Sequence, residues 1–178
     1  EHAAEWHVDP DAIAVIGFSA GGHLAANLAT STSDDVLVAH GYDPDAVRPN
    51  GLMLAYPVIT SGPLAHRGSF DSLLGERRND SQALESVSIE RHIDAKTPPV
   101  FAWHTVPDET VPYENTLMLI DACKKAGVSI EAHLFPQGGH GLSLGTAETA
   151  WQGVNGIEPS IQIWPQLAVS WMRRTFAR

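Results

Sequence analysis

Three polar residues in this 178-residue chain are of the types that form a catalytic triad: Ser19, Asp108 and His140. Ser19 lies in Gly-Phe-Ser-Ala-Gly at 17–21, a match to the G-x-S-x-G pattern in which a sharp turn exposes a serine hydroxyl. Such a hydroxyl is a weak nucleophile until a base takes its proton, which a neutral imidazole can do near pH 7. A carboxylate fixes the tautomer of that imidazole. The chain order predicts Ser19 as nucleophile, His140 as general base and Asp108 as orienting acid.

The residues around Ser19 predict a corner between a strand and a helix. Residues 13–16 (Ile-Ala-Val-Ile) are mostly apolar and β-branched, as in a strand buried on both faces of a parallel sheet. Residues 23–31 are rich in Ala and Leu and predict a helix. A tight turn that merely needs small residues is the alternative interpretation, and the strand and helix on either side favour the catalytic one.

Asp108 and His140 follow two later predicted strands, at residues 100–105 and 128–135. Ligands of parallel sheets gather at the carboxyl ends of the strands, so both side chains are expected near Ser19. Glu109 is the alternative acid, and Thr110 is the rival as a helix cap. A solvated loop histidine is the alternative interpretation of His140, which lies in the glycine-rich run Gly-Gly-His-Gly.

The order of the elements predicts an α/β fold in a single domain, residues 1–178. Strands and helices alternate along the chain, which predicts a mostly parallel sheet with helices on both faces. Residues 61–96 are rich in Gly, Ser and charges, and a connection of this length predicts an insertion or cap that partly covers the site. The remaining predicted elements are a strand at 51–59, which Pro57 ends, and helices at 112–127 and 164–174.

Composition excludes several functional classes. The formal charge of −10 argues against a nucleic-acid partner, because phosphate binding needs a basic face. No apolar run approaches the roughly 20 residues that span a bilayer, so no membrane partner is expected. Cys123 is the only cysteine, so an intrachain disulfide is impossible and a cytoplasmic location is favoured. We expect Cys123 to be a passive, half-buried thiol.

The other ring side chains are given structural interpretations. His23 is expected to pack beside the turn at Ser19, and His104 either touches the site or is buried in hydrogen bonds. The histidines lack the spacing typical of zinc ligands, so neither a metal nor a cofactor is expected. Core packing is favoured over a sugar-stacking face for Trp103, Trp151 and Trp164.

Four ordered blocks together resemble bacterial α/β-hydrolase esterases of the acetylesterase or acetyl-xylan-esterase-like group. The blocks are GFSAGGHLAANLAT, GSFDSLLG, TPPVFAWHTVPDETVPYENTLML and EAHLFPQGGHGLSL. The resemblance covers nearly the whole chain. It implies the α/β-hydrolase fold and hydrolysis of small acyl esters through an acyl-enzyme, with acetylated sugars or xylan fragments as typical substrates. It carries the roles of nucleophile, acid and base onto Ser19, Asp108 and His140. It also implies that the backbone N–H of Ala20, at the start of the predicted helix, is one oxyanion donor.

The sequence departs from that family in one respect. Such enzymes carry a further N-terminal region, which supplies the first strands and a His-Gly-Gly loop that completes the oxyanion hole. No His-Gly-Gly occurs here, so the chain is expected to form the C-terminal part of the sheet and to pair with a missing N-terminal segment or form a homo-oligomer. Without that segment we expect weak activity. The alternatives are a prolyl-oligopeptidase-type peptidase, which Phe18 and Ala20 beside Ser19 disfavour, and a non-catalytic hydrolase fragment.

Overall fold

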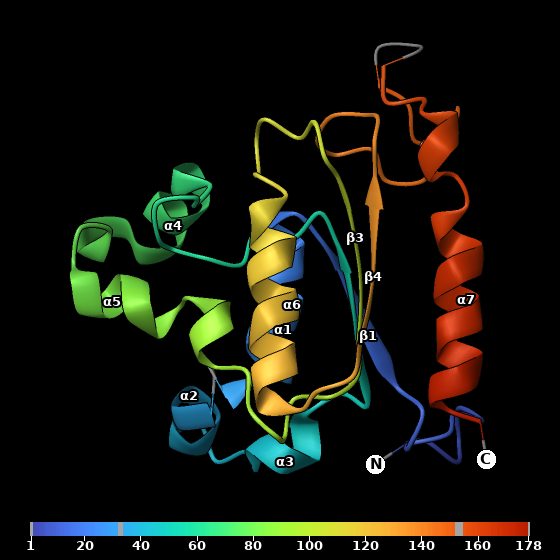
Figure 1. The fold of residues 1–178 in the computed structure, drawn as a ribbon. Coiled ribbons are helices and arrows are strands. Elements are labelled where there is room, and N and C mark those ends of the chain that lie inside the picture. Colours follow the sequence, from blue (N-terminus) through green and yellow to red (C-terminus); the bar gives the residue numbers. More distant parts are fainter. Residues whose placement is uncertain (1, 32–33, 152–154, 178) are drawn as a thin grey trace.

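The computed structural model describes residues 2–31, 34–151 and 155–177, in which four parallel strands form one sheet (Figure 1). The strand order is β1-β2-β3-β4, so strands that follow one another in sequence are also neighbours in the sheet. The strands are β1 (Ala14–Phe18), β2 (Gly51–Ala55), β3 (Val100–Thr105) and β4 (Ile130–Phe135). The α-helices are α1 (Ala20–Ala29), α2 (Asp34–Ala39), α3 (Pro44–Val47), α4 (Arg67–Leu74), α5 (Ser81–Ser86), α6 (Glu114–Ala126) and α7 (Trp164–Thr175).

Helices cover both faces of the sheet, as the alternation of elements predicts. Figure 1 shows α1 and α6 on one side and α7 on the other. The period of two along β2 explains this: Leu52 and Leu54 pack in the cluster beneath α1 and α6, whereas Met53 and Ala55 pack in the cluster beneath α7. The two central strands are buried throughout, which is why they read as continuous apolar runs.

The first strand differs from its prediction. β1 is an outer strand of the described sheet, and Ile16 is 45% exposed. The expectation of burial on both faces is therefore wrong. In the described chain β1 has a strand partner on one side only, so its side chains are covered less completely than those of the central strands. β4 is the outer strand at the opposite side of the described sheet.

The connections between strands hold more structure than the sequence suggests. Residues 61–96 form α4, α5 and two 3-10 helices, at Gly75–Arg77 and Ile89–Arg91. Phe70 of this segment is buried in a small cluster with Val58 and Val111. The polar stretch before β2, which carries turn signals, contains α2 and α3. No helix of the described residues is long and apolar enough to cross a membrane.

Candidate active site

Ser19 occupies a strained turn between β1 and α1. Its backbone adopts φ 55°, a conformation rare for residues with a side chain. Gly17 makes the turn possible: a Cβ there would lie 2.2 Å from the carbonyl oxygen of Gly21. The turn is also tied to the next strand, since the N–H of Ser19 donates to the carbonyl of Ala55 at 2.9 Å. The small residues of the pattern are thus needed for close backbone approach, and the strain is held by the surrounding structure.

The three candidate triad residues lie far apart in the sequence but side by side in the structure. Ser19 Oγ lies 2.7 Å from His140 Nε2, and His140 Nδ1 lies 2.7 Å from Asp108 Oδ2. An ionised carboxylate can only accept, so Nδ1 of His140 carries the proton and Nε2 is left to accept from the serine hydroxyl. These contacts place an imidazole nitrogen that can accept a proton beside the Ser19 hydroxyl and a carboxylate on the other side of that ring.

Asp108 is fixed by donors on both of its oxygens. Oδ1 accepts from the N–H groups of Thr110 and Val111, each at 2.9 Å, and Oδ2 accepts from His140 and, at 3.2 Å, from His104 Nε2. Burial of the side chain acts to raise its pKa, but the hydrogen bonds from His104, His140 and Val111 outweigh burial and hold the pKa well below its usual range. Asp108 is therefore ionised at neutral pH.

Neither Glu109 nor Thr110 takes the position of Asp108 beside His140. Glu109 is exposed, while Thr110 contributes its backbone N–H to Asp108. His104 fulfils both of its interpretations, because it is fully buried and also contacts the site. Its Nε2 faces the carbonyl of Val111 at 2.9 Å as well as Asp108, and its Nδ1 lies 2.8 Å from the Thr116 hydroxyl. Both partners of Nε2 are acceptors, so Nε2 carries the ring proton.

Ala20 is the first residue of α1, directly after Ser19. The N–H groups of a helix's first turn have no partner within the helix and lie at its positive end. The backbone N–H of Ala20 is thus available by position to a negative oxygen that develops beside Ser19, and its role as oxyanion donor stays a prediction.

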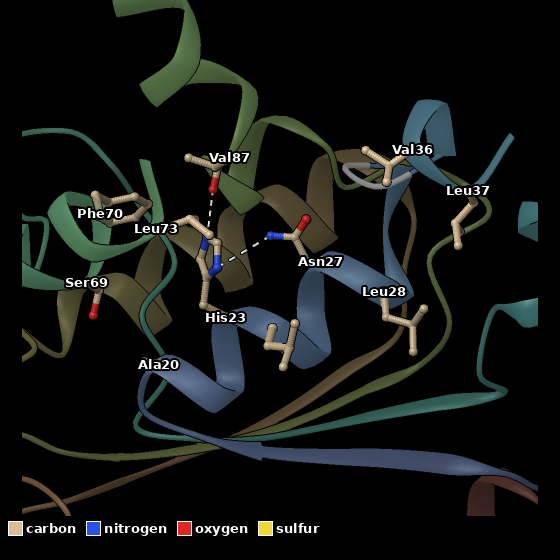
Figure 2. Close-up of a pocket in the computed structure, with 11 residues that line it drawn as sticks. Ala20, His23, Asn27, Leu28, Val36, Leu37, Ser69, Phe70, Leu73 and Val87 are labelled. Atoms are coloured by element: carbon tan, nitrogen blue, oxygen red, sulfur yellow. Dashed lines mark hydrogen bonds between the residues drawn. The ribbon is translucent and has the colours of Figure 1, made fainter. Parts of the chain in front are cut away.

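An apolar pocket of about 500 Å³ begins at Ala20 and runs along α1 toward α2 and α4 (Figure 2). His23 lies in its wall, with Nε2 donating to the carbonyl of Val87 at 2.7 Å and its ring against Phe70. Burial lowers the pKa of His23, so the ring is neutral at pH 7. The backbone N–H of His23 donates to the carbonyl of Ser19 at 3.3 Å, so His23 lies beside that turn as expected.

The tryptophans, Cys123 and possible metal ligands are the remaining candidates for functional residues. Trp103 and Trp164 stack on one another in the core, as expected. The expectation of core packing is wrong for Trp151, whose side chain is 44% exposed. Cys123 is fully buried rather than half-buried, and burial raises the pKa of its thiol to about 12. Among the described residues, no group of three or more His, Cys, Asp or Glu side chains could hold a metal ion.

One residue at the site has no signal in the sequence. Tyr56, directly after β2, packs its ring against His140 in a T-shaped contact, with ring centroids 5.0 Å apart. An aromatic residue at the end of an apolar strand reads as part of the core, so nothing in its local pattern indicates this contact.

A parallel sheet with helices on both faces and a strained serine turn at the carboxyl end of a strand defines an α/β hydrolase. The BD-FAE family model matches residues 1–122, which is more than half of the chain. The chain belongs to the BD-FAE family.

Similar proteins support this assignment. "Endo-1,4-beta-xylanase B" of Butyrivibrio fibrisolvens is 34% identical over 155 residues, and "Acetylxylan esterase" of Xylanibacter ruminicola is 30% identical over 150 residues. These alignments cover 86% and 82% of this chain. The solved acetyl ester-xyloside bifunctional hydrolase from Caldicellulosiruptor lactoaceticus is 36% identical, superimposes with a TM-score of 0.78 and matches 97% of this chain. The resemblance to acetyl-xylan-esterase-like α/β hydrolases is confirmed.

The chain spans only part of each of these proteins. It covers 24% and 29% of the two curated relatives and 60% of the solved hydrolase. Activities carried by those whole proteins therefore apply to this chain as proposals.

Proposed function

We propose that this chain carries the acyl-transfer machinery of a serine carboxylic-ester hydrolase, with Ser19 as nucleophile, His140 as general base and Asp108 as orienting acid. The observation that carries the proposal is the unbroken pair of 2.7 Å contacts from Ser19 Oγ through the His140 ring to Asp108. Nucleophile, base and orienting group in hydrogen-bond reach are the geometric requirement of this mechanism.

The proposed reaction has two halves. Ser19 Oγ attacks the ester carbonyl carbon while its proton passes to His140 Nε2, and the Ala20 N–H stabilises the resulting oxyanion. The bond to the alkoxy oxygen then breaks, and His140 returns the proton to the departing alcohol. Water attacks the acyl-Ser19 ester in the same way and releases the carboxylic acid. Asp108 stays ionised throughout and stabilises the imidazolium of His140.

We propose small acyl groups, acetyl on xylan-derived sugars among them, as the substrates. The names of the relatives and of the solved neighbour support this choice, since they include an acetylxylan esterase and an acetyl ester-xyloside hydrolase. The 61–96 segment contributes Ser69, Phe70 and Val87 to the pocket beside Ala20, which supports a role for the segment in shaping that side of the site.

The direct test is hydrolysis of p-nitrophenyl acetate by the parent chain, by Ser19→Ala and by Ser170→Ala. Ser170 lies exposed on α7 and is a matched control. We expect turnover that Ser19→Ala reduces to background and Ser170→Ala leaves unchanged. Equal rates in all three would reject the proposal.

A second assay separates substrate classes. Acetate release from acetylated xylo-oligosaccharides is expected to depend on Ser19. Ser19-dependent cleavage of p-nitrophenyl acetate without acetate release would keep the esterase and reject the sugar substrate. Faster cleavage of a Gly-Pro-anilide than of the acetate ester would instead indicate a peptidase.

A further inference from the structure

Tyr56 is held in an unusual position at the carboxyl end of β2. It is 4% exposed and has φ 38°, which a residue with a side chain rarely adopts. Its backbone N–H donates to the carbonyl of Trp103 at 2.7 Å, and its ring packs edge to face on the Trp103 ring. Such strain persists only where the surroundings enforce it, and it is frequent beside functional groups.

Two contacts connect the Tyr56 side chain to the loop that carries His140. The ring lies 5.0 Å from the His140 ring, centroid to centroid, at an interplanar angle of 70°. The phenolic oxygen accepts from the backbone N–H of Ser143 at 3.1 Å. Ser143 itself has φ 51°, and its carbonyl accepts from Trp164 Nε1 at 2.8 Å. Tyr56 therefore contacts both the imidazole and the backbone three residues beyond it.

A different contact holds the other side of the loop. The Thr105 hydroxyl donates to the carbonyl of Gly139, immediately before His140, at 3.1 Å. His140 is flanked by Gly139 and Gly141, and Gly141 has φ 77°, so the loop has little stiffness of its own. The contacts from Tyr56 and Thr105 restrain this flexible backbone on either side of His140.

We propose that Tyr56 is a positioning residue that holds the His140 imidazole between Ser19 and Asp108. The proposal rests on the proposed function for its kinetic consequence only; the geometric claim stands without it. Without the ring, the imidazole could swing into the vacated space. Without the hydroxyl, the backbone N–H of Ser143 would lose its acceptor, and the loop would lose one of the hydrogen bonds that hold it. Burial keeps the pKa of Tyr56 above its ordinary value, so the phenol remains protonated across the range in which an esterase would be assayed.

The kinetic test compares Tyr56→Phe and Tyr56→Leu with Tyr42→Phe, a control at an exposed tyrosine. Tyr56→Phe keeps the ring and removes only the acceptor, and we expect it to lower kcat for p-nitrophenyl acetate about 3- to 10-fold. Tyr56→Leu also removes the ring contact, and we expect a loss on the order of 100-fold. KM should change by less than about twofold, because Tyr56 positions the base rather than the ester.

A second readout is independent of turnover. In a Ser19→Ala background, the His140 Nδ1–H that donates to Asp108 should give a low-field proton resonance protected from exchange with water. We expect exchange of that proton to be about tenfold faster when Tyr56→Phe is added, and unchanged when Tyr42→Phe is added. A purely structural role for Tyr56 would lower the melting temperature and leave this exchange unchanged.

The two readouts give decisive outcomes. Faster exchange supports the proposal even if the parent chain fails to hydrolyse the ester, in which case only the proposed function is rejected. Unchanged exchange in Tyr56→Phe overturns the proposal, whether or not kcat falls. If Tyr56→Leu does not fold, Tyr56→Phe, which fills the same space, still decides.

Discussion

Asp108→Asn is expected to disable the proposed base by changing its tautomer. The side chain keeps its size, so the two backbone N–H donors, from Thr110 and Val111 at 2.9 Å, still require an acceptor opposite them. The amide oxygen satisfies them, and the amide NH₂ is then directed at His140 Nδ1. The N–H at His104 Nε2, which also faces that NH₂, keeps the carbonyl of Val111 as its acceptor. His140 must accept at Nδ1 and carry its proton on Nε2, where it faces Ser19 Oγ as a donor instead of an acceptor.

The magnitude follows from that reversal. A triad with the wrong tautomer loses on the order of 10⁴-fold in kcat in a serine protease. For this chain we expect kcat/KM for p-nitrophenyl acetate to fall on the order of 10³- to 10⁴-fold, equivalent to about 4 to 5.5 kcal/mol of barrier. The alternative orientation of the amide would set two donors against two donors at Thr110 and Val111, and is disfavoured for that reason.

The control for this change is Glu109→Gln, which removes the neighbouring exposed carboxylate. It should leave kcat/KM within about twofold, since that carboxylate is not the one bound to His140. A folded Asp108→Asn variant within tenfold of the parent, under conditions in which Ser19→Ala is inactive, would refute the tautomer argument.

Three further predictions concern stability and reactivity. The folded-state pKa of Asp108 lies below its unfolded value of about 4, so its contribution to the free energy of unfolding is present above that pH and is lost as the pH falls further. Urea titrations should therefore show a larger difference in the free energy of unfolding between the parent and Asp108→Asn at pH 7 than at pH 3. Equal differences at the two pH values would contradict this. Cys123, buried and with its pKa raised to about 12, should not react with a thiol reagent at pH 8 until urea unfolds the chain, and rapid native labelling would contradict its placement. Gly17→Ala should destabilise the fold by about 3 kcal/mol, because the new Cβ would meet the carbonyl oxygen of Gly21, whereas Gly21→Ala, with open space around it, is the control; equal melting temperatures for the two would be inconsistent with the tight turn.

The sequence predicts the parts of this fold that depend on local periodicity and sharp turns. Apolar runs bounded by Gly and Pro locate the four strands, and the sequence 17–21 fixes a turn that only small residues allow. Partner order in the sheet and the helices α2 and α3 could not be read in the same way. α2 has six residues, too few for a helical pattern to stand out among turn signals.

Residue types and chain order predict the three central residues of the candidate site but not the contacts that support them. Ser19, Asp108 and His140 are identified from pattern and position, and the structure brings them into contact. The supporting contacts of His104 and Tyr56 depend on three-dimensional packing, which local sequence does not encode. A buried histidine four residues before an aspartate and an aromatic residue after a strand are both common in cores. Neither shows in its own pattern that it holds another side chain.

The central claim is that Ser19 is a nucleophile activated by His140, and its most direct test is covalent labelling. The parent chain, Ser19→Ala and His140→Gln would be treated with a fluorophosphonate, and intact mass and peptide maps would locate the adduct. We expect one adduct on the peptide that contains Ser19, absent in Ser19→Ala and formed far more slowly in His140→Gln. An unlabelled parent chain, or equal labelling of the parent and Ser19→Ala, would contradict the account.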